Sequence, residues 1–178
     1  LLTIQQACAV PLSLAVVPAQ ATPALAARLR EVPDVDVLQH GYAHVNHAAA
    51  GEKKKMELGL HRPAMMVLGE LGTGWLALER LSGARALAVM VPPWNRIAPP
   101  LVHTLPEIGF KGLSTFGPRL RPHPTRGLLE INTHVDLIDW KGERGFVGET
   151  AALETLVAAL TRARAASPPA SAEPVGIL

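Results

Sequence analysis

Three histidines lie close together in the segment His-Gly-Tyr-Ala-His-Val-Asn-His at residues 40–47. His40 and His44 are four positions apart, but Gly41, directly after a strand pattern, predicts a loop rather than a helix. A loop can bring two imidazoles to one ion, because coordination fixes metal–nitrogen contacts of about 2.0–2.1 Å and no particular secondary structure. The segment therefore predicts a divalent-metal site with His40 and His44 as ligands and His47 as a further ligand or an orienting residue. The alternative is that these histidines cap a turn or sit in the core, bonded to the backbone.

Two further clusters of polar and aromatic residues follow predicted strands. The segment Pro-Pro-Trp-Asn-Arg at 92–96 follows a strand pattern over 86–91, and the segment 134–140 follows a strand pattern over 128–133. Ligands of open α/β sheets and barrels gather at the carboxyl ends of strands, so we expect a functional rim there. Its candidate residues are Trp94, Arg96, His134, Asp136, Asp139 and Trp140. The alternatives are core aromatics for the tryptophans, an Asx-turn or surface pair for the aspartates, and a structural role for His134.

The alternation of strand and helix patterns predicts an α/β fold with a parallel sheet. Strands are predicted over 12–17, 35–40, 86–91, 112–116, 128–135 and 175–178, and helices over 1–10, 22–30, 63–81, 101–108 and 150–165. The continuous apolar run of 12–17 predicts a strand buried on both faces. Apolar periodicity predicts two buried helix faces, formed by Met66, Leu68, Leu71, Leu76 and Leu78 and by Leu153, Leu156, Val157 and Leu160. Between the histidine segment and the long helix, residues 46–59 predict a loop with one helical turn.

Composition favours a folded domain. The chain has 178 residues, of which 48% are hydrophobic and 18% charged, which predicts one domain over 1–178 with a Pro/Ser/Ala linker at 166–174. The single cysteine, Cys8, excludes a disulfide within the chain and is predicted to be a small buried residue. No run reaches the roughly 18 apolar residues that a membrane span requires.

Charge argues against a nucleic-acid partner. Seventeen basic and fifteen acidic side chains give a net charge of +2, and no Lys/Arg stripe alternates with aromatics. The one dense basic run, Lys53-Lys54-Lys55, stands beside Glu52 and Glu57 and predicts a solvated helix start. Compartment and oligomeric state are left open by the sequence.

Three segments resemble motifs of the polysaccharide deacetylase (NodB-like) family, carbohydrate esterase family four. Residues 40–44 resemble its His-Gly-x-x-His metal motif, Val91-Pro92-Pro93-Trp94 resembles its Arg-x-Pro-(Tyr/Phe) segment, and residues 136–140 resemble its Asp-x-x-Asp-Trp motif. The end of the chain, 175–178, resembles the strand that precedes a catalytic histidine in the family. The order of these segments along the chain matches the family.

The resemblance implies a deformed, incomplete (β/α) barrel and a hydrolase acting on carbon–nitrogen bonds other than peptide bonds. It implies removal of N-acetyl or related acyl groups from a carbohydrate, with a divalent metal, zinc first and cobalt or nickel as alternatives, on His40 and His44. The backbone N–H of Trp94 would stabilise the oxyanion, and Asp136 or Asp139 would tune a histidine. Tyr42, Trp94, Arg96 and Trp140 are the candidates for binding the substrate.

The sequence departs from the family at three points. No Asp-Asp pair is present to supply a base and a third ligand, Leu178 stops before the catalytic histidine, and Val91 replaces the arginine of the third motif, for which Arg96 is the substitute. We expect either a fragment that lacks its first strand and last residues or a diverged, inactive relative.

Two other functions remain open beside the deacetylase. One is an allantoinase-like amidase that acts on a small amide on the same scaffold. The other is a carbohydrate-binding protein that keeps an aromatic groove without catalysis.

Overall fold

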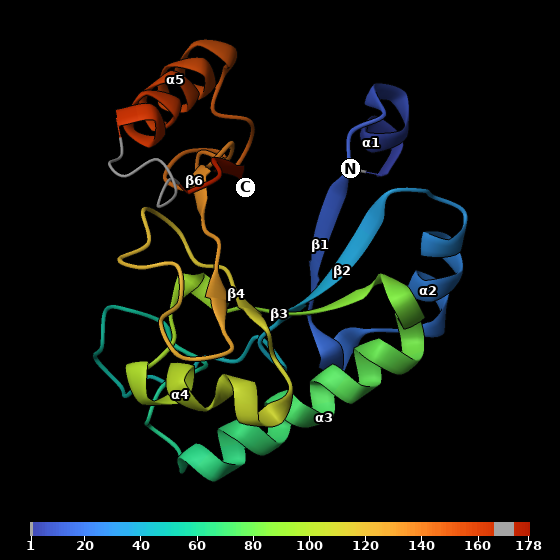
Figure 1. The fold of residues 1–178 in the computed structure, drawn as a ribbon, viewed down its shortest axis with the longest axis vertical. Coiled ribbons are helices and arrows are strands. Elements are labelled where there is room, and N and C mark those ends of the chain that lie inside the picture. Colours follow the sequence, from blue (N-terminus) through green and yellow to red (C-terminus); the bar gives the residue numbers. More distant parts are fainter. Residues whose placement is uncertain (1, 166–172) are drawn as a thin grey trace. The chain divides into compact units, whose positions relative to one another are not determined.

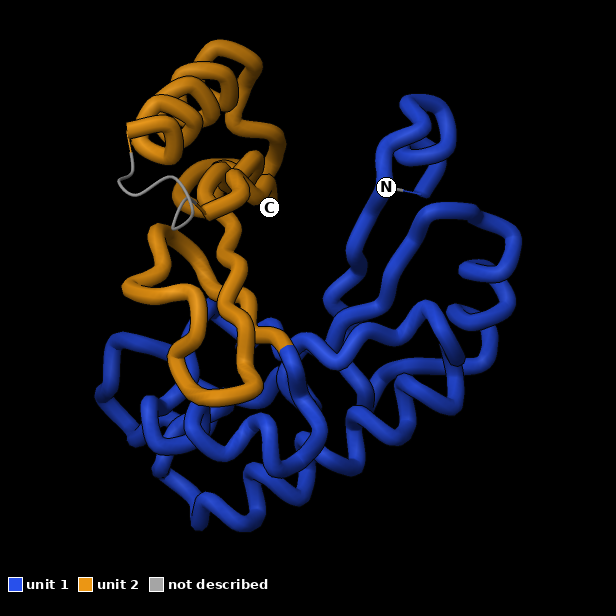
Figure 2. The backbone as a smooth tube through the Cα atoms, in the orientation of Figure 1, with its two compact units in different colours: residues 1–111 blue, residues 112–178 orange. Residues whose placement is uncertain are grey.

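The computed structural model describes residues 2–165 and 173–178, so most of the predicted linker at 166–174 lies outside the described residues. The chain divides into two compact units, Leu1–Lys111 and Gly112–Leu178 (Figures 1 and 2). This boundary falls inside the single domain that the sequence predicts. No helix among the described residues has the length and apolar character needed to cross a membrane.

The first unit contains three parallel strands. They are β1 (Leu12–Val16), β2 (Val35–His40) and β3 (Ala86–Val91), with β2 between the other two. The register pairs His40 with Val91, so the carboxyl ends of β2 and β3 lie side by side. The predicted strands and their parallel direction are confirmed.

Strand β1 corrects the prediction of a strand buried on both faces. Its residues alternate between partly buried and exposed, because Leu12, Leu14 and Val16 pack against the core of the first unit whereas Ser13 and Ala15 are exposed. The core of the first unit is instead built around β2, whose Val35 and Val37 pack with Leu29, Val32 and Leu78.

Four α-helices belong to the first unit, and all four correspond to predicted helices. They are α1 (Leu2–Cys8), α2 (Pro23–Arg30), α3 (Ala64–Ser82) and α4 (Pro99–Thr104). Short 3₁₀ segments lie at Pro18–Gln20, Gly83–Arg85, Pro93–Asn95 and Leu105–Ile108, so the predicted helix over 101–108 is α4 followed by a 3₁₀ turn. Cys8 is exposed at the end of α1, which corrects its predicted burial.

Helix α3 packs against β2, β3 and α2, but its buried stripe is shifted from the predicted one. The buried residues are Val67, Leu71, Gly74 and Leu78, which are spaced by three or four positions and therefore share one side of the helix. Met66 and Leu76 lie off this stripe and are 55% and 49% exposed. Their predicted burial is wrong because apolar residues are present on more than one side of α3.

The described residues of the second unit form short parallel strand pairs and one long helix. β4 (Gly112–Leu113) pairs with β5 (Leu129–Glu130), β6 (Thr133–Val135) pairs with β7 (Gly176–Ile177), and α5 covers Glu149–Ala165. The strand predicted over 128–135 is interrupted before Thr133. At the interruption Asn132 is buried and its side chain bonds to Thr115 and Gly117.

Helix α5 begins and ends close to the predicted positions, but its leucine-rich side is not buried. Leu153 and Val157 are each 60% exposed, and Leu160 is also exposed. The side that is turned inward carries Ala159, which is buried, together with the partly buried Ala152, Leu156 and Ala163, and these four residues follow one another at intervals of three or four positions. The small side chains therefore face the interior, and only Leu156 of the predicted face is partly covered.

Candidate functional site

The end of β2 is fixed by a buried glutamine. Gln39 is fully buried, and its Nε2 donates hydrogen bonds to the carbonyl oxygens of Gly41, at 2.9 Å, and of Leu71 in α3, at 3.0 Å. Gly74 leaves room for this amide, because a Cβ there would lie 2.6 Å from Nε2 of Gln39. The strand end that carries His40 is thus tied to α3.

His40 is held with one ring nitrogen available. Its Nδ1 lies 2.9 Å from the carbonyl oxygen of Val91 on β3. A carbonyl only accepts, so Nδ1 carries the proton and Nε2 of the neutral ring keeps its lone pair. Burial lowers the pKa of His40 below its ordinary value, and nearby His44 adds to this, whereas the Val91 bond and Glu57 act in the opposite direction. The net effect favours the neutral imidazole, the form that binds metals.

The loop after His40 brings a second histidine and a tryptophan into contact. The ring centroids of His40 and His44 are 5.1 Å apart, and those of His44 and Trp94 are 4.5 Å apart. Gly41, His44, Trp94 and Asn95 all have φ between +55° and +59°. Such values are costly for residues other than glycine, and they concentrate at functional sites. Two of the three predicted strand-end clusters therefore meet at the carboxyl ends of β2 and β3.

The basic run is part of this neighbourhood and is not a helix start. Residues 51–57 form turns and bends, with Lys53, Lys54 and Lys55 exposed as predicted. Nζ of Lys55 lies 5.8 Å from the centroid of the Trp94 ring, within cation–π range. Arg96 donates from Nη1 to the carbonyl oxygen of Lys55, at 2.9 Å. The segment 53–55 therefore contacts the 3₁₀ turn Pro93–Asn95 and the residue after it, which we call the Trp94 turn.

Glu57 is a residue of this site that sequence reasoning missed. It is 1% exposed, and its Oε1 accepts hydrogen bonds from the backbone N–H groups of Tyr42, Ala43 and His44. Next to three lysines in the sequence it has the pattern of a solvated acid. No spacing rule signals its contact with residues thirteen to fifteen positions earlier.

The other predicted ligand near the loop, His47, does not complete a metal-binding set. Its backbone N–H donates to the carbonyl oxygen of Met56, at 2.9 Å. Among the described residues no group of three or more His, Cys, Asp or Glu side chains is arranged to hold a metal. The donor chemistry of His40 and His44 fits two positions of a divalent-metal site, and the third protein ligand is not among their neighbours.

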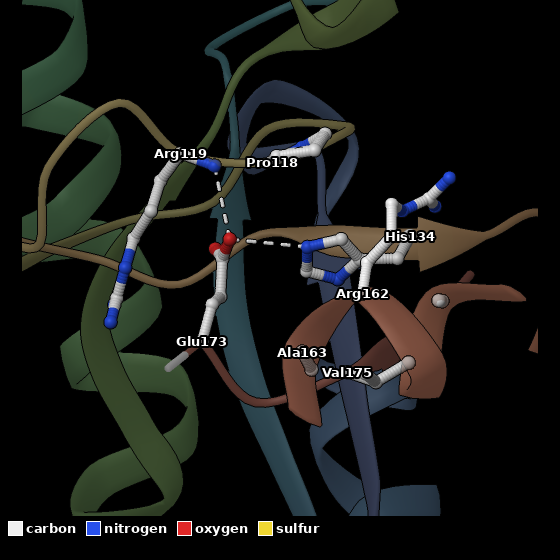
Figure 3. A pocket seen from close by; sticks show the side chains of 8 residues that line it. Pro118, Arg119, His134, Arg162, Ala163, Glu173 and Val175 are labelled. Atoms are coloured by element: carbon white, nitrogen blue, oxygen red, sulfur yellow. Dashed lines mark hydrogen bonds and ion pairs between the residues drawn. The ribbon is translucent and has the colours of Figure 1, made fainter. Parts of the chain in front are cut away.

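His134 belongs to the second unit and has both ring nitrogens engaged. Its Nε2 lies 3.1 Å from Oε2 of Glu173, and its Nδ1 accepts from the backbone N–H of Gly176, at 3.3 Å. The pair lines a pocket of about 210 Å³ together with Arg119 and Arg162, and Figure 3 shows these side chains around it. Neither nitrogen is available as a metal ligand in this arrangement.

The aspartates predicted to tune a histidine bond to their own loop. Asp136 accepts from the backbone N–H of Ile138 and from Nε1 of Trp140, at 2.9 and 2.6 Å. Asp139 accepts from the backbone N–H groups of Lys141 and Gly142. The bonds to the N–H groups of Ile138 and Lys141 are the Asx-turn bonds of the alternative interpretation. Trp140 is 58% exposed and is not a core aromatic.

One solved structure provides the comparison for this fold. No protein-family model and no curated protein sequence matches the chain. The structure is similar to that of a protein from Mycobacterium smegmatis described as a "putative polysaccharide deacetylase", with a TM-score of 0.65 and 18% sequence identity. The match covers 99% of this chain and 60% of the other. The likeness confirms the α/β fold with a parallel sheet that the alternation of strand and helix patterns predicts, and the chain spans 60% of the length of the protein it matches.

Proposed function

We propose that the chain belongs to a metal-dependent carbohydrate deacetylase, with His40 and His44 as two of the metal ligands. The observation that carries the proposal is the contact of His40, His44 and Trp94 at the carboxyl ends of β2 and β3. It is supported by the likeness of the fold to that of a protein described as a deacetylase. The deformed (β/α) barrel of the deacetylase family is part of the same proposal.

In this proposal the residues near β2 and β3 have separate roles. His40 and His44 would hold a divalent metal, zinc first, which would provide Lewis acidity toward the acyl carbonyl. The carbonyl of Val91 keeps the proton on Nδ1 of His40 and so directs Nε2 to the ligand position. The backbone N–H of Trp94 donates to the developing oxyanion, and Tyr42, Trp94 and Arg96 bind the sugar.

The residues of the second unit contribute less to this proposal. Asp136 and Asp139 have no catalytic part in it, because their carboxylates bond to their own loop. Exposed Trp140 offers a flat apolar surface to a sugar ring.

The test couples metal content to catalysis. Purified protein, loaded with zinc or cobalt and dialysed, is assayed for bound metal and for acetate released from N-acetylglucosamine oligomers. We expect His44→Ala to lose both metal and acetate release, while His103→Ala, which changes an exposed histidine of α4, retains both. Metal binding and turnover that survive His44→Ala would contradict the proposal.

A carbohydrate-binding protein without catalysis is the second candidate. It is favoured by the absence of a third metal ligand among the described residues. The same assay separates the two candidates, because a binding protein would retain N-acetylglucosamine oligomers without releasing acetate.

A further inference from the structure

Glu57 occupies an unusual position for an acidic side chain. It is buried in the first unit against the loop of residues 41–47, which we call the histidine loop. Its backbone neighbours hold it there: Leu58 accepts a hydrogen bond from the N–H of Ala98, at 2.8 Å, and Met56 accepts one from His47. The carboxylate is therefore fixed by the chain on both sides.

One oxygen of Glu57 accepts hydrogen bonds from three consecutive backbone N–H groups of the histidine loop. Oε1 accepts from the N–H groups of Tyr42, Ala43 and His44 at 3.3, 2.7 and 3.1 Å. Three consecutive amides that point at one anion form a nest, and hydrogen bonds to a charged acceptor are stronger than those between neutral groups. These bonds stabilise the positive φ of His44, which a histidine does not favour by itself.

The other oxygen of Glu57 has no protein partner. Oε2 is buried without a hydrogen bond, and no ion pair joins Glu57 to a basic side chain in the described part of the chain. This oxygen packs against the α-carbon of Gly41, where a Cβ would collide with it. Buried charges in proteins are normally paired with an opposite charge or with a metal. Glu57 is thus a buried acidic group next to two histidines, with an incomplete set of partners.

We propose that Glu57 is a positioning residue of the metal site, an inference that rests on the proposed function. Its Oε1 sets the loop conformation that turns His44 toward His40. Its negative charge, placed near both imidazoles without coordinating, offsets the charge of a cation that they bind. The hydrogen bonds of Oε1 and the negative charge of the carboxylate can be removed separately by substitution.

The experiment compares two substitutions with a matched control. Glu57→Gln keeps an oxygen for the three N–H groups and removes the charge, whereas Glu57→Ala removes both. The control is Glu70→Gln, which breaks the bidentate pair that Glu70 of α3 forms with Arg62. Cobalt affinity is measured by calorimetry, the coordination geometry of bound cobalt by its visible absorption, and folding by thermal unfolding of the metal-free proteins.

We expect Glu57→Gln to weaken cobalt binding about 10-fold and Glu57→Ala about 100-fold, the range seen for residues that orient metal ligands. The absorption spectrum is expected to change in Glu57→Ala and to persist in Glu57→Gln, while Glu70→Gln lowers stability alone. If Glu57→Ala does not fold, Glu57→Gln still tests the charge. Wild-type cobalt affinity in both Glu57 variants would overturn this inference and leave the proposed function standing. A loss of cobalt affinity in Glu70→Gln equal to that in the Glu57 variants would do the same. A wild-type protein that binds no cobalt would overturn the proposed function and this inference together.

Discussion

His40 in the first unit and His134 in the second are both candidate metal ligands by sequence, yet their rings are engaged differently. His40 uses one nitrogen, in a bond to the carbonyl of Val91, whereas His134 uses both, in bonds with Glu173 and Gly176. The carboxylates near the two histidines also differ in their partners. Glu173 is paired with His134, whereas Glu57 has no basic partner among the described residues. The first arrangement leaves bonding capacity for a ligand, and the second satisfies its own polar groups.

This difference shows that a histidine at a strand end is not by itself a metal ligand. A ring with one nitrogen bonded to an acceptor is oriented and keeps a lone pair for an ion. A ring with both nitrogens bonded is a structural element, because removing either bond would leave a buried polar group unpaired.

The largest expected effect is the difference in cobalt binding between a His40→Ala variant and a His134→Ala variant. We expect His40→Ala to weaken cobalt binding by more than about 100-fold, because it removes a ligand rather than an orienting partner. His134→Ala should bind cobalt as the wild type does, after a loss of stability of about 1–3 kcal/mol from the lost hydrogen bonds to Glu173 and to the backbone N–H of Gly176. Calorimetric titration with cobalt and urea unfolding measure the two effects. Equal cobalt affinity in the two variants would break the comparison.

An intermediate effect is expected at Gly41. Alanine there must adopt a φ of +59° and would meet Oε2 of Glu57 and, at 2.6 Å, Cγ of Pro93. Strain and overpacking together predict a loss of about 2–5 kcal/mol in the free energy of unfolding.

Gly51 provides the matched control for this substitution. It also has a positive φ, of +90°, but its Cβ position is open. Gly51→Ala should therefore cost only the backbone strain, about 1 kcal/mol. A Gly41→Ala protein as stable as Gly51→Ala in urea unfolding would mean that the loop is not packed against Glu57.

The smallest effect is expected at Asp136. Asp136→Ala removes an exposed Asx-turn bond and the bond to the Trp140 indole, for an expected loss of about 0.5–1.5 kcal/mol. Cobalt affinity should stay at the wild-type value, because the carboxylate bonds within its own loop. A fall in cobalt affinity of tenfold or more would instead support the role in tuning a histidine that the motif resemblance implies.

Much of the first unit could be predicted from local patterns. The strands at β2 and β3 and the helix α3 follow from apolar periodicity and from the Gly and Pro residues that end them. The burial of individual residues was predicted less well: Met66, Leu153 and Val157 are exposed although they fit an apolar face. Periodicity states which residues share a side of a helix, but not which of two apolar sides meets the core.

The sequence by itself determined the elements, their alternation, and the placement of His40 and Trp94 at strand ends, because these depend on spacing along the chain. Only the tertiary structure decided which groups meet there. The bonds of Glu57 to the histidine loop, of His40 to Val91 and of His134 to Glu173 join residues 13 to 51 positions apart. Such contacts depend on how the parallel strands and their connecting loops pack, which no local pattern encodes. The sequence therefore predicts a pair of candidate ligands, and the packing around each ring distinguishes a histidine open to a metal from one already satisfied.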